Sequence, residues 1–173
     1  MANSFTSQII KDTTEHTVIK LTASFDGSGQ ESNNARIVAN TLYGALATNS
    51  YPVANVHGGA ANTTLEFYNL SLNRMWYDCS ANGNVELTWD ATAPATLMFL
   101  NGNGEYDGMG NWTTIPNNAG SGKTGDIGVT TRNMVDGDSY TIIMELRKDN
   151  AHYQRGQFND PAAFNYGEYA IRP

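Results

Sequence analysis

Hydrophobic and polar residues alternate along three short stretches of the chain, at residues 18–25, 85–90 and 140–147. The side chains of a strand point alternately to two faces, so this two-residue period predicts strands with one buried face. The pattern is typical of an all-β fold, and we expect an antiparallel β-sandwich or jelly-roll-like barrel with long Gly/Asn-rich loops and at most one short helix. The residues expected to be buried are Ile19, Leu21, Ala23, Phe25, Val85, Leu87, Trp89, Tyr140, Ile142, Met144 and Leu146.

Turn-forming residues separate the apolar stretches. Asn82-Gly83 lies between two of them, and this dipeptide favours the left-handed backbone of a two-residue hairpin turn. A second hairpin is expected at 135–137. Pro94 has no amide proton, which suits the first position of a strand or a sheet edge. Residues 35–47 are the best helical candidate, although a strand is also compatible with them.

The chain has 173 residues, about the length of one domain. We expect an N-terminal arm at 1–15, a β-sandwich domain at 16–149 and an aromatic C-terminal tail at 150–173 that docks on the domain or on a neighbour. Residues 101–122 are rich in Gly and Asn, and this composition predicts a loop of unusual length.

Charge and cysteine content exclude several classes of protein. The net charge is -7 and only 16% of the residues are charged, without a cluster of Lys and Arg, so nucleic acid is not expected as a partner. The chain has neither an apolar run of about 18 residues nor the features of a signal peptide, so we expect no membrane segment and synthesis in a cytoplasm. The single Cys79 excludes an internal disulfide and is expected to be a small buried hydrophobe.

Two glycine-containing segments resemble ligand loops. Gly122-Lys123-Thr124 is similar to the end of a phosphate-binding loop, but Asn117 stands where that motif needs its first glycine and a strand-like segment follows. We therefore expect no nucleotide site at this segment.

Asn103, Glu105 and Asp107 alternate before Gly108, like the start of a calcium loop. The twelfth position of that loop is Thr114 instead of a bidentate glutamate, so the motif is incomplete. A solvated glycine loop is the main expectation, with bound metal or glycan at 101–122 left open.

Residues suited to catalysis are scattered. His16, His57 and His152 lie far apart in the sequence, and none belongs to a motif with a nucleophile. Glu86 and Asp90 have the spacing of an ordinary polar strand face. We expect a protein without enzymatic activity and without a cofactor.

Four aromatic residues offer an alternative, because Trp76, Tyr77, Trp89 and Trp112 could stack on sugars as in carbohydrate-binding β-sandwiches. Trp89 belongs to the buried set of its strand. Trp112 lies in the long loop and is the aromatic most available for contact. A carbohydrate-binding module therefore stays an alternative function.

Three segments carry a resemblance to a known class of protein: MANSFTSQIIKDTTEHTVIKLT, VELTWDATAPATLMFLNGNGEYDG and PNNAGSGKTGDIGVTT. Together they look like small virion structural proteins of tailed phages, particularly those that infect marine cyanobacteria. The resemblance implies a capsid decoration (cement) protein on the outer surface of the virion head. Its partners would be the major capsid protein and copies of itself, with a dimer or trimer matching the local symmetry. A tail, neck or baseplate component is the principal rival.

The expected contact elements are the N-terminal arm, the long loop and the aromatic tail. We expect deletion of Met1 to Asp12 to weaken assembly while leaving the fold intact. The candidate partner contacts are Phe5, Ile9, Ile10, Trp112, Phe158, Phe164, Tyr166 and Tyr169.

Overall fold

The computed structural model describes residues 2–45, 68–108, 113–148 and 153. In these ranges more than half of the residues lie in strands, and the only helical element is a single 3-10 turn. The elements in chain order are β1 (Ser4–Asp12), β2 (His16–Ser24), β3 (Asn34–Ile37), η1 (Ala39–Thr41), β4 (Leu70–Cys79), β5 (Asn84–Trp89), β6 (Ala95–Leu100), β7 (Asn103–Asp107), β8 (Ile115–Pro116), β9 (Ile127–Arg132) and β10 (Ser139–Lys148).

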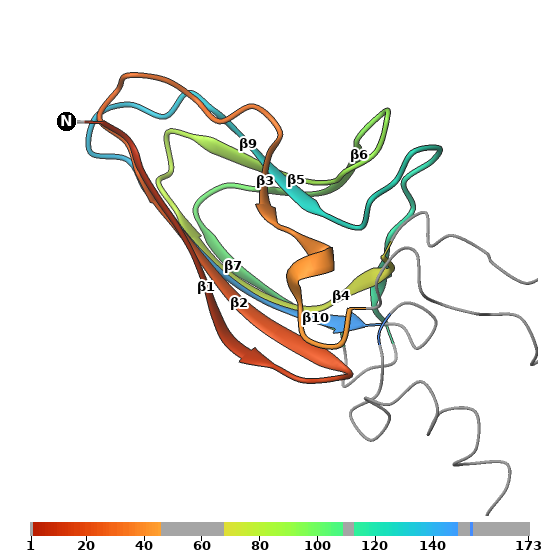
Figure 1. The fold of residues 1–173 in the computed structure, drawn as a ribbon. Helices are drawn as coiled ribbons and strands as arrows, with labels where there is room; N and C mark the ends of the chain where they lie inside the picture. The colour runs from red at the N-terminus through yellow and green to blue at the C-terminus, as the bar shows by residue number, and fades with distance from the viewer. Residues whose placement is uncertain (1, 46–67, 109–112, 149–152, 154–173) are drawn as a thin grey trace, which may run out of the picture.

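The strands form two antiparallel sheets that face each other (Figure 1). The larger sheet has the order β1-β2-β10-β4-β7, with β8 also paired to β4, and the smaller sheet has the order β3-β9-β5-β6. The predicted antiparallel β-sandwich is confirmed. Across the described strands the sheets stay separate and do not close into a barrel.

The alternating apolar residues fill the space between the sheets. Every residue that the three alternations assign to the core is buried, and Trp89, Leu87 and Ile142 are fully enclosed. Burying a side chain of this size contributes about 1.5–3 kcal/mol, so the two inner faces hold the sandwich together. Trp89 is confirmed as a core residue.

Both predicted hairpins are wrong, because each turn carries the chain from one sheet to the other. β4 belongs to the larger sheet and β5 to the smaller one, and the Gly83 amide donates to the Ser80 carbonyl oxygen at 3.2 Å without left-handed backbone at Asn82 or Gly83. Residues 135–137 join β9 to β10 in the same way. A turn signal predicts a reversal of direction, but it does not tell whether the next strand pairs with the previous one. Both edges of β4 are already occupied, by β10 and by β7 with β8.

A hairpin does form between β5 and β6, which pair from Val85 with Leu100 to Trp89 with Ala95. Pro94 comes directly before β6, the edge strand of the smaller sheet. The expectation that Pro94 marks a strand start or an edge is therefore confirmed.

Two segments differ from their predicted structure. The predicted helix at 35–47 begins instead with β3, in which the β-branched Ile37 is buried next to β9, and continues into η1; residues 46 and 47 lie outside the described part. The predicted loop at 101–122 contains β7 and β8, which complete the outer edge of β4. In both cases a neighbouring strand edge supplies hydrogen bonds that local composition does not reveal.

The expected N-terminal arm is largely a strand, because residues 4–12 form β1 and pair with β2. Phe5 packs edge-on against Phe25 with ring centroids 5.7 Å apart, and the Arg36 guanidinium lies 4.2 Å from the Phe5 ring centroid. Deleting this segment would remove a sheet edge and not a free arm, so we no longer expect the truncated chain to keep its fold intact.

Candidate contact surfaces

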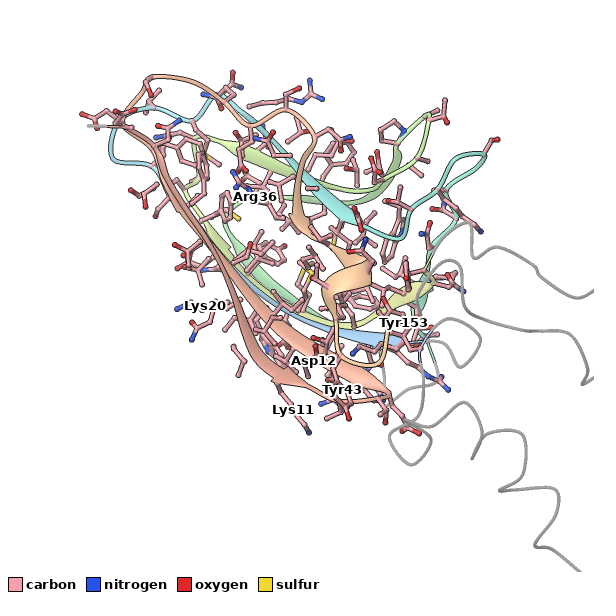
Figure 2. The ribbon with its side chains drawn as sticks, in the orientation of Figure 1. Lys11, Asp12, Lys20, Arg36, Tyr43 and Tyr153 are labelled. Carbon is pink, nitrogen blue, oxygen red and sulfur yellow. The ribbon has the colours of Figure 1, made fainter. Side chains whose placement is uncertain are left out.

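Lys148, the last residue of β10, has a side chain with 0% exposure. Its ammonium group donates to the Asp12 carboxylate and to the carbonyl oxygens of Thr13 and Tyr43, both at 2.8 Å. Burial lowers the pKa of Lys148, and the hydrogen bond to Asp12 opposes that shift. These bonds fix the end of β1 against the chain that follows η1, as Figure 2 shows for Asp12 and Tyr43.

The chain from Arg36 to Tyr43 runs beside β1. The Ser7 hydroxyl donates to the Arg36 carbonyl oxygen at 2.8 Å, and the Tyr43 amide donates to the Asp12 carboxylate at 2.7 Å. Of the seven exposed large hydrophobic residues in the described ranges, four lie on this side of the sandwich. They are Ile9 (51% exposed), Ile10 (53%), Val38 (37%) and Tyr43 (49%), and we call them the β1 side patch.

The exposure of these residues follows from the edge position of β1. Ile9 pairs with Ile19, which is buried, so both side chains point to the inner side of the larger sheet. Ile10 occupies a register shift and has no residue opposite it on β2. The outer edge of β1 pairs with no described strand, and an open edge with apolar side chains is a site at which other chains can pack.

A second surface is the outward face of the larger sheet. Strand register places one row of outward residues across all five long strands. Trp76 is 45% exposed and lies near the middle of this row. The row reads Gln8, Lys20, Ile143, Trp76 and Glu105, and the next row reads Lys11, Val18, Glu145, Arg74 and Asp107.

Charge is divided across this outward face. Lys11 and Lys20 lie on β1 and β2, whereas Asp78, Glu105 and Asp107 lie on β4 and β7. Two ion pairs lie on this face: within the acidic half Arg74 Nε of β4 is 3.3 Å from Asp107 Oδ1 of β7, and His16 Nδ1 of β2 is 3.1 Å from Glu145 Oε1 of the central strand β10. The face therefore has a basic half and an acidic half on either side of Ile143 and Trp76.

A buried polar cluster links the two sheets away from both surfaces. The Glu31 side chain has 0% exposure and accepts hydrogen bonds from Arg36 of β3 and, at 2.7 Å, from the Tyr140 hydroxyl of β10. Burial raises the pKa of Tyr140, and the Glu31 charge adds to the shift. Each carboxylate oxygen is bonded to a different sheet, so the cluster has a structural role. No sequence motif marks Glu31, because Tyr140 lies 109 residues away in the chain.

The residues that resembled a calcium loop lie on a strand. Asn103, Glu105 and Asp107 occupy alternate exposed positions of β7, and Asp107 pairs with Arg74. The described residues hold no group of three or more His, Cys, Asp or Glu side chains that could bind a metal ion. The loop prediction is wrong at these three positions.

Other residues that could take part in catalysis or ligand binding have structural roles. Glu86 accepts hydrogen bonds from Thr96 at 2.7 Å and from Arg132 at 3.1 Å. Thr124 donates to Asp90 at 2.9 Å, and the segment after it leads into β9, not into a helix. Cys79 is buried as expected, and burial together with the nearby Asp78 raises the pKa of its thiol to about 12.

The candidate contact residues have different positions. Phe5 is half-buried under Arg36, whereas Ile9 and Ile10 are exposed in the β1 side patch. Tyr153 belongs to the predicted tail and is buried, with its hydroxyl donating to the Ala39 carbonyl oxygen at 2.9 Å. Trp112, Phe158, Phe164, Tyr166 and Tyr169 lie outside the described residues, as do His57 and His152.

The outward position of Trp76 could not be predicted from the sequence. It lies between Met75 and Tyr77, and the pairing of Met75 with the buried Met144 points both neighbours inward and Trp76 outward. Strand parity alone could have assigned Trp76 to one face. The sheet pairing is needed to show that this face is the outer one.

Searches against protein-family models, curated proteins and solved structures find no match. Within the described residues, no helix has the length and apolar character needed to span a membrane.

Proposed function

We propose that this protein is a structural component of a tailed-phage virion, and specifically a decoration (cement) protein that binds the outer surface of the head. The observation that carries the proposal is the β1 side patch, where Ile9, Ile10, Val38 and Tyr43 lie along one open sheet edge. The resemblance of three sequence segments to phage structural proteins supports the choice of a virion.

The patch suits repeated attachment through modest contacts. Covering two half-exposed isoleucines contributes about 1–3 kcal/mol in total, which is weak for a single binding event. On a capsid, neighbouring copies that also contact each other convert such weak contacts into stable attachment through effective concentration. The major capsid protein is the partner in this proposal, and synthesis takes place in the host cytoplasm.

The rigid support behind the patch favours a docking role. Lys148 holds Asp12 and the Tyr43 carbonyl in place, so the patch is presented on an ordered edge of the sandwich. A surface that is already ordered loses less conformational entropy when it binds. A tail, neck or baseplate component could also dock through an ordered apolar patch. The number of copies per particle distinguishes such a component from a head protein.

Antibody labelling of intact phage particles that carry this gene, viewed by electron microscopy, tests the proposal. We expect dense and even labelling over the head, with hundreds of copies per particle in quantitative mass spectrometry. Labelling confined to one vertex or to the tail would move the protein to the tail machinery. Particles without label would overturn the virion role.

A further inference from the structure

We propose that the outward face of the larger sheet binds the same face of a second copy of this chain and forms a twofold dimer. The proposal goes beyond capsid binding and holds or fails without it, because it concerns the purified protein alone. It rests on the order of charged and apolar side chains across the five long strands of the sheet.

β10 is the central strand of the path β1-β2-β10-β4-β7. A twofold axis parallel to β10 and lying between two such faces places β1 of one copy over β7 of the other, and β2 over β4. Each row of side chains then meets itself in reverse order. Interfaces of this kind are self-complementary, because residue i contacts residue j twice.

The row through Trp76 matches its own reverse. Lys20 of one copy meets Trp76 of the second copy, which is the geometry of a cation–π interaction, and Gln8 meets Glu105. Ile143 meets Ile143 on the axis and supplies an apolar centre. Among the described residues, the side chains of Lys20 and Glu105 take part in no ion pair or hydrogen bond, so both can contact a second chain.

The neighbouring row is also largely complementary. Lys11 meets Asp107 of the second copy, and Val18 meets the side-chain stem of Arg74. Glu145 meets Glu145 on the axis, which is unfavourable, but His16 lies 3.1 Å from this carboxylate and supplies positive charge when protonated. On the other side of the central row, Thr22 meets Asp78 and can donate a hydrogen bond to it.

The size of the face is adequate for association. Four of the five strands have nine or ten residues, and standard strand rise and spacing give a face of about 700 Å² on each copy. Stable interfaces bury about 800 Å² on each partner. Each sheet is twisted, so the two faces approach most closely along the central row, which contains Lys20 and Trp76.

The dimer leaves the β1 side patch partly free. Ile9 points to the inner side of the larger sheet, away from the proposed interface, because it pairs with the buried Ile19. One copy can therefore bind a second copy through the outward face and another partner through the patch.

Sedimentation velocity of the purified full-length chain between 1 and 200 μM tests the proposal. We expect a reversible monomer–dimer equilibrium that weakens at 0.5 M NaCl. Trp76→Ala and Lys20→Glu should each raise the dissociation constant at least tenfold. Lys11→Glu should also weaken the dimer, and Lys11→Glu/Asp107→Lys should recover most of that loss, since Lys11 of one copy meets Asp107 of the other.

Phe99→Ser is the matched control, because Phe99 is 65% exposed and lies on the smaller sheet. Its dimerisation should equal that of the wild type, and circular dichroism should show that every variant is folded. A chain that stays monomeric at 200 μM would overturn the proposal, as would a dimer that Trp76→Ala and Lys20→Glu leave unchanged. A monomer that still decorates heads would leave the proposed function intact.

Discussion

Replacing Lys148 by methionine removes a buried positive charge and keeps a side chain of similar length. In the folded protein Lys148 donates to the Asp12 carboxylate and to the carbonyl oxygens of Thr13 and Tyr43. The methionine side chain cannot donate to any of these oxygens. Asp12 would keep the hydrogen bond from the Tyr43 amide, but its charge would lose the ammonium partner.

The cost of this replacement follows from the burial of the two groups. Removing one partner of a buried ion pair costs about 3–5 kcal/mol, because the other charge is left uncompensated. The Asp12 side chain is 15% exposed and keeps one hydrogen bond, which places the expected loss near the lower limit, at about 3 kcal/mol. For a chain of this length the loss corresponds to a fall in Tm of about 6–12 °C.

Urea unfolding of four proteins measures the interaction: the wild type, Lys148→Met, Asp12→Asn and the double variant. The losses in the two single variants should add up to more than the loss in the double variant, and the difference, the coupling energy, should be about 1–3 kcal/mol. Arg147→Met is the matched control, since Arg147 is an exposed basic residue next to Lys148 on β10, and it should change stability by less than about 0.5 kcal/mol. A loss below 1 kcal/mol for Lys148→Met, or strictly additive costs, would refute this reasoning.

Three further predictions concern other parts of the fold. Burial raises the pKa of Asp126 above its ordinary value of 3.8. Between pH 3.8 and this raised pKa the folded chain binds more protons than the unfolded chain, so stability falls as pH rises through that window. Asp126→Asn keeps an oxygen to accept the Ala39 amide at 2.7 Å, and it should raise Tm at pH 7 but not at pH 3. Gly125 has φ +95°, and a Cβ added there would clash with the Tyr68 carbonyl oxygen. Gly125→Ala should therefore lower the free energy of unfolding by at least about 2 kcal/mol in denaturant unfolding. Gly29→Ala should be neutral, because no atom lies within 4 Å of a Cβ added at that position. Cys79 should not react with a thiol reagent at pH 8 until guanidinium unfolds the chain, and rapid labelling of the native protein would contradict the assigned burial.

The strands with clear alternation could be predicted from the sequence because one physical rule determines both their conformation and their burial. At residues 19–23 of β2, 85–89 of β5 and 140–146 of β10, every second residue is apolar and faces the other sheet. The same rule identified Trp89 as a core residue before its neighbours were known.

The partition of strands between sheets could not be predicted, because it depends on pairing between distant residues. Asn82-Gly83 reverses the chain whether β5 pairs with β4 or crosses to the other sheet. β1 and β7 carry weak apolar patterns, and their strand conformation follows from hydrogen bonds to β2 and β4. The outward position of Trp76 has the same origin.

Re-addition of purified protein to phage heads that lack it tests most directly whether the β1 side patch makes the functional contact. Ile9→Ser/Ile10→Ser removes the two most exposed apolar side chains of the patch, and Phe99→Ser serves as a control at an even more exposed apolar residue on the other sheet. We predict saturable binding by the wild type and by the control, and at least tenfold weaker binding by the double variant, all three proteins being folded. Binding of the double variant equal to that of the wild type, or no binding by the wild type, would contradict the account.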